Sequence, residues 1–434
     1  MDHITNKKTF RHYLYFLFGQ QFSLLGSMIV GFVITWWLTV ETGSAVILSI
    51  SVFLMLIPQI VITPISGVIS DRWSRKAIIA ISDSLQAVVT FILLCFFLLD
   101  IPNVWFVLGI NTFRAALFAF QLPAVSALIP AMVPKDKLSR INGVNFLFSS
   151  LVFSIGPVVA AVLYEFFPIE EIMLLDISTF IIALIPLLLI KIPSIKNIRE
   201  EHTKSSFTKD FKEGLFVIKA IPGLLAMIAF AMIFNFINRP FNVLLPYYVK
   251  FIHDGTAFDL AILMFSFQIA SMIGALITSI KKDWKHKIKI NIIGASMYFA
   301  GYFAFIFAPK GNFLFMIIGN IPGTIIFPIT VALYLEILQT KVSKDKIGRI
   351  MSIDHMISMA IAPIGALIAG PLAELLGVVY LFYICALIGL MFPILIWLLT
   401  KIRDLEDKKE IEEEKEVEEL IKLPEFPEII EKVE

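Results

Sequence analysis

The sequence predicts an all-α polytopic membrane protein with twelve transmembrane helices, arranged as two pseudo-symmetric bundles of six. Three observations support this fold class: the composition, the spacing of the apolar runs and an internal repeat. Of the 434 residues, 58% are hydrophobic and 16% are charged, and the mean hydropathy is +0.86. Soluble domains average roughly 45–50% apolar and about 25% charged residues. The chain is therefore too apolar to be a soluble domain, and we expect a lipid bilayer to surround it.

The apolar runs between polar breaks define the predicted spans. Each is long enough to cross a hydrocarbon layer of about 30 Å at about 1.5 Å per helical residue. The first run continues to Val40, well beyond the ~7–15 apolar residues of a signal peptide, so we expect it to be retained as a membrane helix. The twelve spans cover residues 12–39, 45–70, 77–99, 104–130, 142–167, 171–191, 216–249, 257–280, 289–308, 312–338, 350–375 and 378–401.

A short motif occurs twice in the chain. Residues 133–142 read VPKDKLSRIN and residues 342–351 read VSKDKIGRIM. The first copy precedes the fifth span and the second precedes the eleventh, so each holds the same place in a set of six. Repeats at equivalent positions indicate a tandem of similar bundles. The expected parts are an N-terminal bundle, a charged linker, a C-terminal bundle and an acidic tail, at residues 1–191, 192–215, 216–401 and 402–434.

The basic residues predict how the chain is oriented. Lys and Arg gather around residues 71–76, 135–140, 281–289 and 341–349, whereas the alternate loops carry acidic residues such as Glu41. Because positively charged loops stay on the cytoplasmic side, we expect a plasma-membrane protein with both termini in the cytoplasm.

Several functions are disfavoured by what the sequence contains. It has no G-x-x-x-x-G-K-[ST] phosphate-binding loop, which argues against direct use of ATP. Cys95 and Cys385 both lie in apolar runs, where we expect reduced, buried thiols. We find no constellation of nucleophile and base, and we expect no enzyme activity, no cofactor, no metal and no nucleic-acid partner. We expect a monomer.

Charged residues inside the spans are the candidate functional residues. A charge at membrane depth is costly and usually faces a partner or a wet cavity. Arg114 lies near the middle of the fourth span, Asp83 in the third and Asp176 in the sixth. Either carboxylate could load and release a proton. The alternatives are structural: Arg114 fixes its span to a neighbour, Asp83 pairs with the basic loop before it, and Asp176 caps or pairs near the outer interface.

Further polar candidates lie in other spans. Arg239 precedes Pro240 in the seventh span and is a candidate gate or substrate contact. Gln21 in the first span and Asp354 with His355 in the eleventh are additional buried polar positions.

The loop between the second and third spans resembles a family signature. Its pattern G-x-x-x-D-R-x-x-R-K is similar to the motif between helices 2 and 3 of the major facilitator superfamily, carried here by Gly67, Asp71, Arg72, Arg75 and Lys76. The resemblance implies a transporter that works by alternating access. It also implies that these residues form a conformational latch, with Asp71 at the start of the eleventh span and the arginines on nearby carboxylates.

Two further motifs resemble the antiporters of that superfamily. Arg114 matches the arginine of the fourth-helix motif, which the resemblance links to proton relay. Gly156 and Pro157 resemble the start of the motif G-P-x-x-G-G, which implies a bend that seals the interface between the halves. Residues 37–45, 347–350 and 362–365 look like the macrolide-efflux branch, a group of drug:proton antiporters.

The function implied is secondary active transport, with proton-coupled efflux of amphipathic small molecules through the bilayer. Uptake or flipping of a lipid, siderophore or nutrient by the same fold is an alternative. A non-transporting membrane sensor is a second alternative, of a different class.

Overall fold

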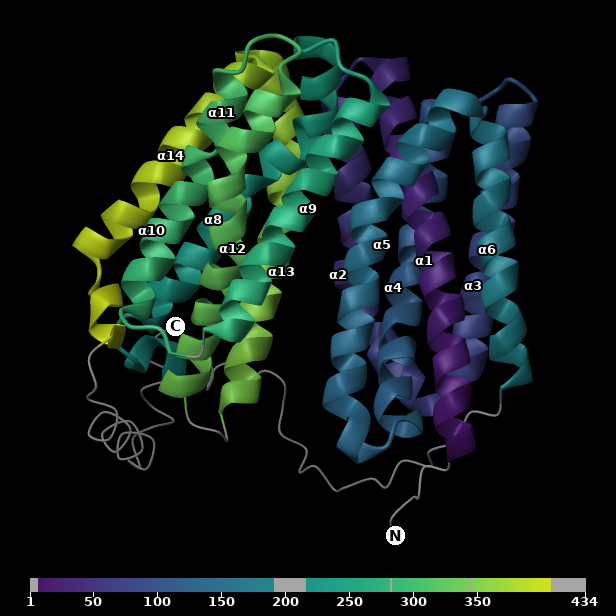
Figure 1. The fold of residues 1–434 in the computed structure, drawn as a ribbon, viewed down its shortest axis with the longest axis horizontal. Helices are drawn as coiled ribbons and strands as arrows, with labels where there is room; N and C mark the ends of the chain where they lie inside the picture. The colour runs from purple at the N-terminus through teal and green to yellow at the C-terminus, as the bar shows by residue number, and fades with distance from the viewer. Residues whose placement is uncertain (1–6, 191–215, 282, 343–345, 407–434) are drawn as a thin grey trace. The chain divides into compact units, whose positions relative to one another are not determined.

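The computed structural model describes residues 7–190, 216–281, 283–342 and 346–406 (Figure 1). Within these ranges the chain is helical without a β-strand, and 12 helices are long and apolar enough to cross a membrane. This confirms the predicted fold class. The membrane helices are α1 (Lys7–Thr42), α2 (Ala45–Arg72), α3 (Arg75–Leu98), α4 (Val104–Met132), α5 (Leu138–Phe166), α6 (Ile169–Leu189), α8 (Leu224–Tyr247), α9 (Ala257–Ile280), α10 (Lys287–Ala300) with α11 (Tyr302–Ile306), α12 (Phe313–Lys341), α13 (Ile347–Leu376) and α14 (Val378–Leu399).

The seventh span differs from its prediction. A continuous helix is expected over 216–249, but residues 216–220 form a separate helical segment and α8 begins only at Leu224. Pro222 cannot donate a backbone hydrogen bond, and Gly223 has a φ of +83°, which favours glycine. A Cβ at Gly223 would also lie 2.5 Å from the carbonyl oxygen of Lys401. The helix is therefore interrupted both by the residue types at 222 and 223 and by the close packing of Gly223 against the backbone of Lys401.

The two copies of the repeated motif have matching local structure. Val133 ends α4 with φ −101° and ψ 131°, and Val342 ends α12 with φ −114° and ψ 135°. In both copies the valine is buried and the next long helix, α5 or α13, begins a few residues later. The equivalence inferred from sequence therefore extends to the backbone conformation of the helix ends.

Contacts between Cα atoms group the chain into two compact units. The first comprises 1–198, 242–268 and 366–378, and the second comprises 199–241, 269–365 and 379–434. The predicted domain boundaries stay a prediction. The predicted linker and nearly all of the predicted tail lie outside the described residues.

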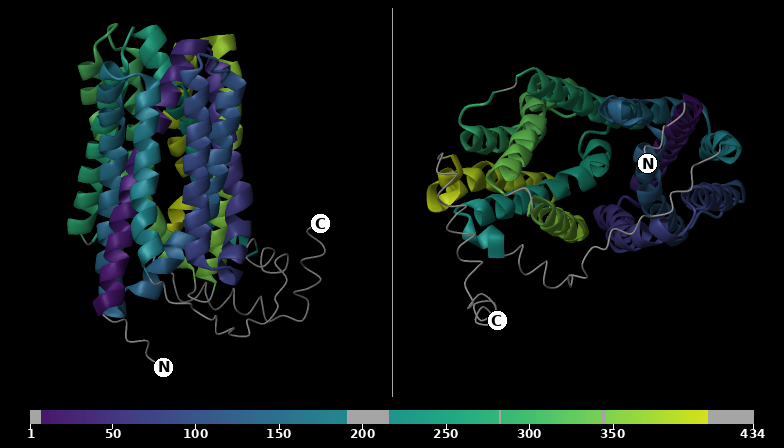
Figure 2. Two further views of the ribbon diagram at one scale, coloured as in Figure 1. Left: turned by 90° about the vertical axis from the view of Figure 1, so that its right-hand side faces the viewer. Right: turned by 90° about the horizontal axis from the view of Figure 1, so that it is seen from below.

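Helices α1–α6 form most of the first unit. Helix α1 packs against α5 and α6, α3 packs against α4 and α6, and α2 packs against α4. Figure 2 shows these helices running side by side. Small residues allow the close approach of α1 to α6: a Cβ at Gly26 would lie 2.1 Å from the hydroxyl of Thr179. Such small-residue contacts are typical of membrane helices, which pack without a hydrophobic driving force between them.

The second unit has a core rich in aromatic side chains. Helix α10 packs against α12. Phe241 of α8 contacts the rings of Tyr302, Phe305 and Phe382 at centroid distances of 4.0, 4.8 and 5.0 Å. This aromatic packing holds α8, α11 and α14 together.

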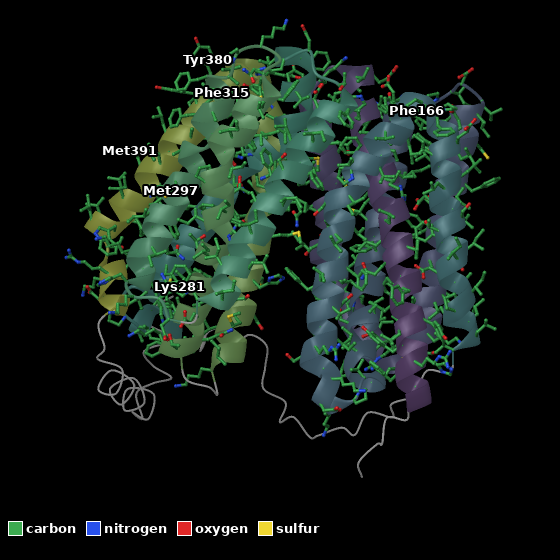
Figure 3. The ribbon with its side chains drawn as sticks, viewed as in Figure 1. Phe166, Lys281, Met297, Phe315, Tyr380 and Met391 are labelled. Carbon is green, nitrogen blue, oxygen red and sulfur yellow. The ribbon has the colours of Figure 1, made fainter. Side chains whose placement is uncertain are left out.

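Large apolar side chains cover the outside of the helices. Phe166 is 75% exposed and Tyr380 is 70% exposed, and Figure 3 shows both, together with Met391, at the periphery of the helices. Extensive exposed apolar surface is unusual for a protein in water. These side chains are placed as expected for residues that contact lipid.

Candidate functional site

A buried ion pair joins two of the residues singled out from the sequence. Arg114 on α4 donates from Nη2 to Oδ2 of Asp176 on α6 at 2.7 Å. The side chain of Asp176 is fully buried and also accepts hydrogen bonds from the hydroxyls of Thr90 on α3, at 3.2 Å, and Ser27 on α1, at 3.3 Å. Four helices therefore meet at one carboxylate. Of the two structural alternatives for Asp176, a cap or a pair, the structure has a pair, and its partner Arg114 is thereby fixed to a neighbouring helix.

Asp83 on α3 is surrounded differently. It is 1% exposed, and its Oδ2 accepts from the amide of Gln20 at 3.0 Å while Oδ1 accepts from the amide of Gln121 at 2.9 Å. Gln86 in turn donates to the amide oxygen of Gln121 at 3.1 Å. No basic side chain pairs with Asp83 within the described part of the chain. The described partners of Asp83 are thus the amides of two other helices, and pairing with the basic loop, the alternative for Asp83, stays a prediction because the side chain of Arg72 is not described.

The two sites form polar layers at different depths of one bundle. The same three helices supply both layers, and the contributing residues are seven apart on each helix: Gln20 and Ser27 on α1, Asp83 and Thr90 on α3, Gln121 and Arg114 on α4. Seven residues are close to two helical turns, about 10 Å along the axis, and return to the same face. Glutamines within apolar runs, Gln20, Gln86 and Gln121, were the sequence signal for the Asp83 layer. The seven-residue spacing shared by three helices connects this layer to the other.

Gln21 belongs to a third contact. Its amide donates to Oδ1 of Asn145 at 3.0 Å and to the hydroxyl of Ser149 at 3.3 Å, both on α5. Gln21 follows Gln20 directly but points to another helix, because neighbouring residues project about 100° apart around a helix.

Gly156 and Pro157 are buried within the first unit. Helix α5 continues through Pro157 from Leu138 to Phe166. A Cβ at Gly156 would lie 2.9 Å from Cβ of Met28 on α1. The glycine of the antiporter-like motif thus permits close packing of α5 on α1 in one bundle, whereas the resemblance implies a seal between halves.

The residues of the predicted latch are described only in part. Arg75 donates to the carbonyl of Ala127 at 3.0 Å rather than to a carboxylate. Lys76 donates to the carbonyls of Leu188 and Ile190, at 2.6 and 2.7 Å, where α6 ends. A cation at a helix C-terminus is favourable because the helix dipole is negative there. A Cβ at Gly67 would meet nothing within 4 Å. The side chains of Asp71 and Arg72 lie outside what the structure describes, and the latch stays a prediction.

The second unit contains a cavity of about 310 Å³ between α8, α10, α12 and α13. Aromatic side chains form much of its wall: Phe230 and Phe234 on α8, with Phe327 and Tyr334 on α12. Asp354 on α13 also lines it and accepts a hydrogen bond from the hydroxyl of Tyr334. The sequence indicated Asp354 as a buried polar position but not the cavity, because its walls come from four separated helices.

Arg239 lies elsewhere in the same unit. It is partly buried on α8, and a Cβ at Gly365 of α13 would lie 3.1 Å from Cβ of Arg239. The structure therefore places Arg239 at a close approach of two helices and not among the residues of the cavity. Its role as a gate or a substrate contact stays a prediction.

The described residues form twelve helices able to span a membrane, with buried polar layers in the first unit and a cavity between helices of the second, and these are features of a polytopic membrane transporter. The family model of the Major Facilitator Superfamily matches residues 16–362, and the chain belongs to this family. Within it, the chain is similar to the macrolide-efflux branch, as the sequence motifs predicted.

The comparisons with individual proteins agree with this assignment. The chain is 28% identical to "Macrolide efflux protein A" of Streptococcus pyogenes over 396 residues, which cover 90% of this chain and 96% of the relative. It is 22% identical to "Multidrug efflux pump Tap" of Mycolicibacterium fortuitum, over 88% of this chain and 93% of the relative. A crystal structure of a mutant form of the nucleoside transporter NupG superimposes with a TM-score of 0.70 at 13% identity, covering 91% of this chain and 99% of that one. At this identity the structural match concerns the fold alone.

Proposed function

We propose that this protein exports amphipathic small molecules from the cell in exchange for protons, by alternating access. The family and fold make it a transporter. Export is supported by the names of two relatives that align over most of this chain, a macrolide efflux protein and a multidrug efflux pump.

The observation that carries the proton coupling is the contrast between the two buried carboxylates. The charge of Asp176 is compensated by Arg114 at 2.7 Å. Asp83 is equally buried, but among the described side chains its hydrogen-bond partners are the neutral amides of Gln20 and Gln121. A buried charge is costly unless it is paired, and binding a proton removes the charge altogether. We therefore assign Asp83 as the residue that carries the coupling proton.

The surrounding amides suit this role. A glutamine side chain offers both N–H donors and a carbonyl acceptor. Gln20 and Gln121 donate to the ionised carboxylate, and rotation of either amide would offer a carbonyl oxygen to the protonated acid. The layer can thus solvate Asp83 in both charge states without admitting a counter-ion.

The Arg114–Asp176 layer lies two helical turns away on the same helices. We therefore assign it to the path that protons take between Asp83 and the outer side of the membrane. We place the basic loops, including Lys135 and Lys137, in the cytoplasm because positively charged loops are retained there. This orientation puts both termini in the cytoplasm and puts the Asp83 layer closer to that side. The plasma membrane is the location that this function requires.

The proposal is tested with purified protein in liposomes that have an acidic lumen. Molecules inserted with their cytoplasmic side outward should move a substrate into the lumen as protons leave. Tetraphenylphosphonium is a suitable first probe because its fixed charge prevents trapping by pH, and the membrane potential is clamped with potassium and valinomycin. The proposal predicts accumulation that nigericin abolishes and that protein-free liposomes lack. If several amphipathic compounds cross at rates that do not depend on the pH gradient, the proposed coupling is wrong.

A further inference from the structure

The cavity in the second unit combines aromatic walls with a single charge. Among the residues that line it, Asp354 is the one that is charged, and the others are aromatic, aliphatic or neutral polar. Its volume of about 310 Å³ lies at the lower end of the ~300–1,000 Å³ range of small-molecule sites. The cavity is therefore large enough for a compact ligand or for one end of a larger one.

Among the side chains that the structure describes, no lysine or arginine forms a salt bridge with Asp354. Its Oδ1 accepts a hydrogen bond from the hydroxyl of Tyr334, a neutral donor. His355, the next residue in the chain, interacts electrostatically with Asp354, but its side chain is exposed. Lys287 on the wall helix α10 pairs with Glu336 at 2.6 Å and is thereby compensated. The cavity thus carries a negative charge that a ligand can match.

The aromatic side chains of the wall pack against one another. Phe234 stacks on Phe327 with a centroid distance of 5.8 Å and an interplanar angle of 14°, and it also contacts Phe299 at 5.0 Å. The face of an aromatic ring attracts a cation, by about 0.5–1 kcal/mol at exposed sites and about 2 kcal/mol when desolvated. A carboxylate and several rings around one cavity therefore favour the same ligand charge.

We propose that this cavity binds lipophilic monocations, with the positive centre at Asp354 and the apolar body against Phe230, Phe234 and Phe327. An anion would be repelled by Asp354, and a neutral ligand would leave the carboxylate without a compensating charge, which costs free energy in an apolar site. Tyr334 is a positioning residue that holds Oδ1 and leaves Oδ2 toward the ligand. This inference rests on the proposed export function, because the cavity is a cargo site only if the protein exports its ligand.

The test is equilibrium binding of radiolabelled tetraphenylphosphonium to the purified full chain in detergent, with triphenylphosphine oxide as an uncharged competitor. Wild type should bind the cation at least about tenfold more tightly than the neutral compound, because only the cation is attracted by the charge of Asp354 and by the aromatic rings. Asp354→Asn should lose this preference. Asp404→Asn is the matched control: it makes the same substitution at an exposed carboxylate outside the cavity lining, and binding should not change.

A second variant, which places a carboxylate elsewhere in the cavity, tests the inference if Asp354→Asn does not fold. Asn235 also lines the cavity and bonds only to the carbonyl of Ala231 on its own helix. Asn235→Asp alone should strengthen cation binding, and in the Asp354→Asn background it should restore the preference in part. Equal competition by triphenylphosphine oxide, or unchanged cation binding in a folded Asp354→Asn variant, would overturn the inference. Because binding is measured without flux, a cation preference without transport would instead count against the proposed export.

Discussion

At the scale of single residues, partners decide what each buried charge can do. Asp83 and Asp176 are of one residue type, lie at membrane depth in one bundle and are both almost inaccessible. One is held by an arginine and two hydroxyls, and the other by two amides. The first arrangement suits a fixed structural charge, whereas the second suits a group that gains and loses a proton.

The Arg114–Asp176 pair should behave as a unit in unfolding experiments. Removing one partner of a buried ion pair typically costs about 3–5 kcal/mol because the other charge remains uncompensated. Arg114→Gln and Asp176→Asn should each lower the melting temperature in detergent, and the double variant should be more stable than either single variant. Melting-temperature losses that simply add in the double variant would show that the two side chains do not interact.

These residues also show what sequence reasoning could predict. Arg114, Asp83 and Asp176 are recognisable as charges within apolar runs. Their partners are not recognisable. Gln20 and Gln121 are far apart in the sequence, and a glutamine in an apolar run does not indicate which side chain it contacts. Closeness in sequence pointed to the basic loop as a partner for Asp83, whereas the described partners come from α1 and α4.

At the scale of helices, glycine decides how closely two elements approach. Gly143 and Gly156 both lie on α5, but a Cβ at Gly143 would meet nothing within 4 Å, whereas one at Gly156 would lie 2.9 Å from Cβ of Met28. The pair offers a controlled comparison of helix propensity with packing on one helix.

Alanine substitutions at these two positions should have opposite effects. Gly143→Ala should stabilise the protein by about 0.5–1 kcal/mol, the ordinary advantage of alanine over glycine within a helix. Gly156→Ala should destabilise it because α1 and α5 must move apart. Chemical or thermal unfolding in the same detergent measures both variants, and an equal stabilisation by both would mean that α5 does not pack on α1 at Gly156.

Helix boundaries were predictable where apolar runs end in charged residues and were missed where the backbone is interrupted inside an apolar run. All twelve spans were recognised from hydropathy. The break before α8 was not, because Pro222 and Gly223 lie in a sequence apolar enough to be read as one helix. The left-handed φ of Gly223 and its contact with the backbone at Lys401 are tertiary features.

At the scale of the whole molecule, the repeated motif predicts an equivalent position for two distant segments. Single cysteines at Lys137 and Lys346, one in each copy, should both be labelled only from the cytoplasmic side in intact cells. Cysteines at Glu170 and Lys310, in the alternate loops, should react with an impermeant reagent from outside. If the two motif positions react from opposite sides, the tandem arrangement of bundles is wrong.

We propose that proton binding and cargo binding occur in different parts of the chain. The polar layers of the first unit carry the proton, and the aromatic cavity of the second unit holds the cargo. Exchange then requires that binding of one ligand alters access for the other, which is a coupling free energy between distinct sites. The division of tasks predicts that variants at Asp83 impair coupling more than cargo binding.

The most direct test is proton movement driven by substrate. Liposomes containing the protein and an internal pH-sensitive dye receive a gradient of tetraphenylphosphonium without an initial pH gradient, with the membrane potential clamped. Wild type should move protons opposite to the cation, Asp83→Asn should exchange labelled for unlabelled cation without moving protons, and the exposed control Asp100→Asn should match wild type. Cation transport by wild type with no proton movement, or full proton movement in Asp83→Asn, would contradict the assignment of Asp83.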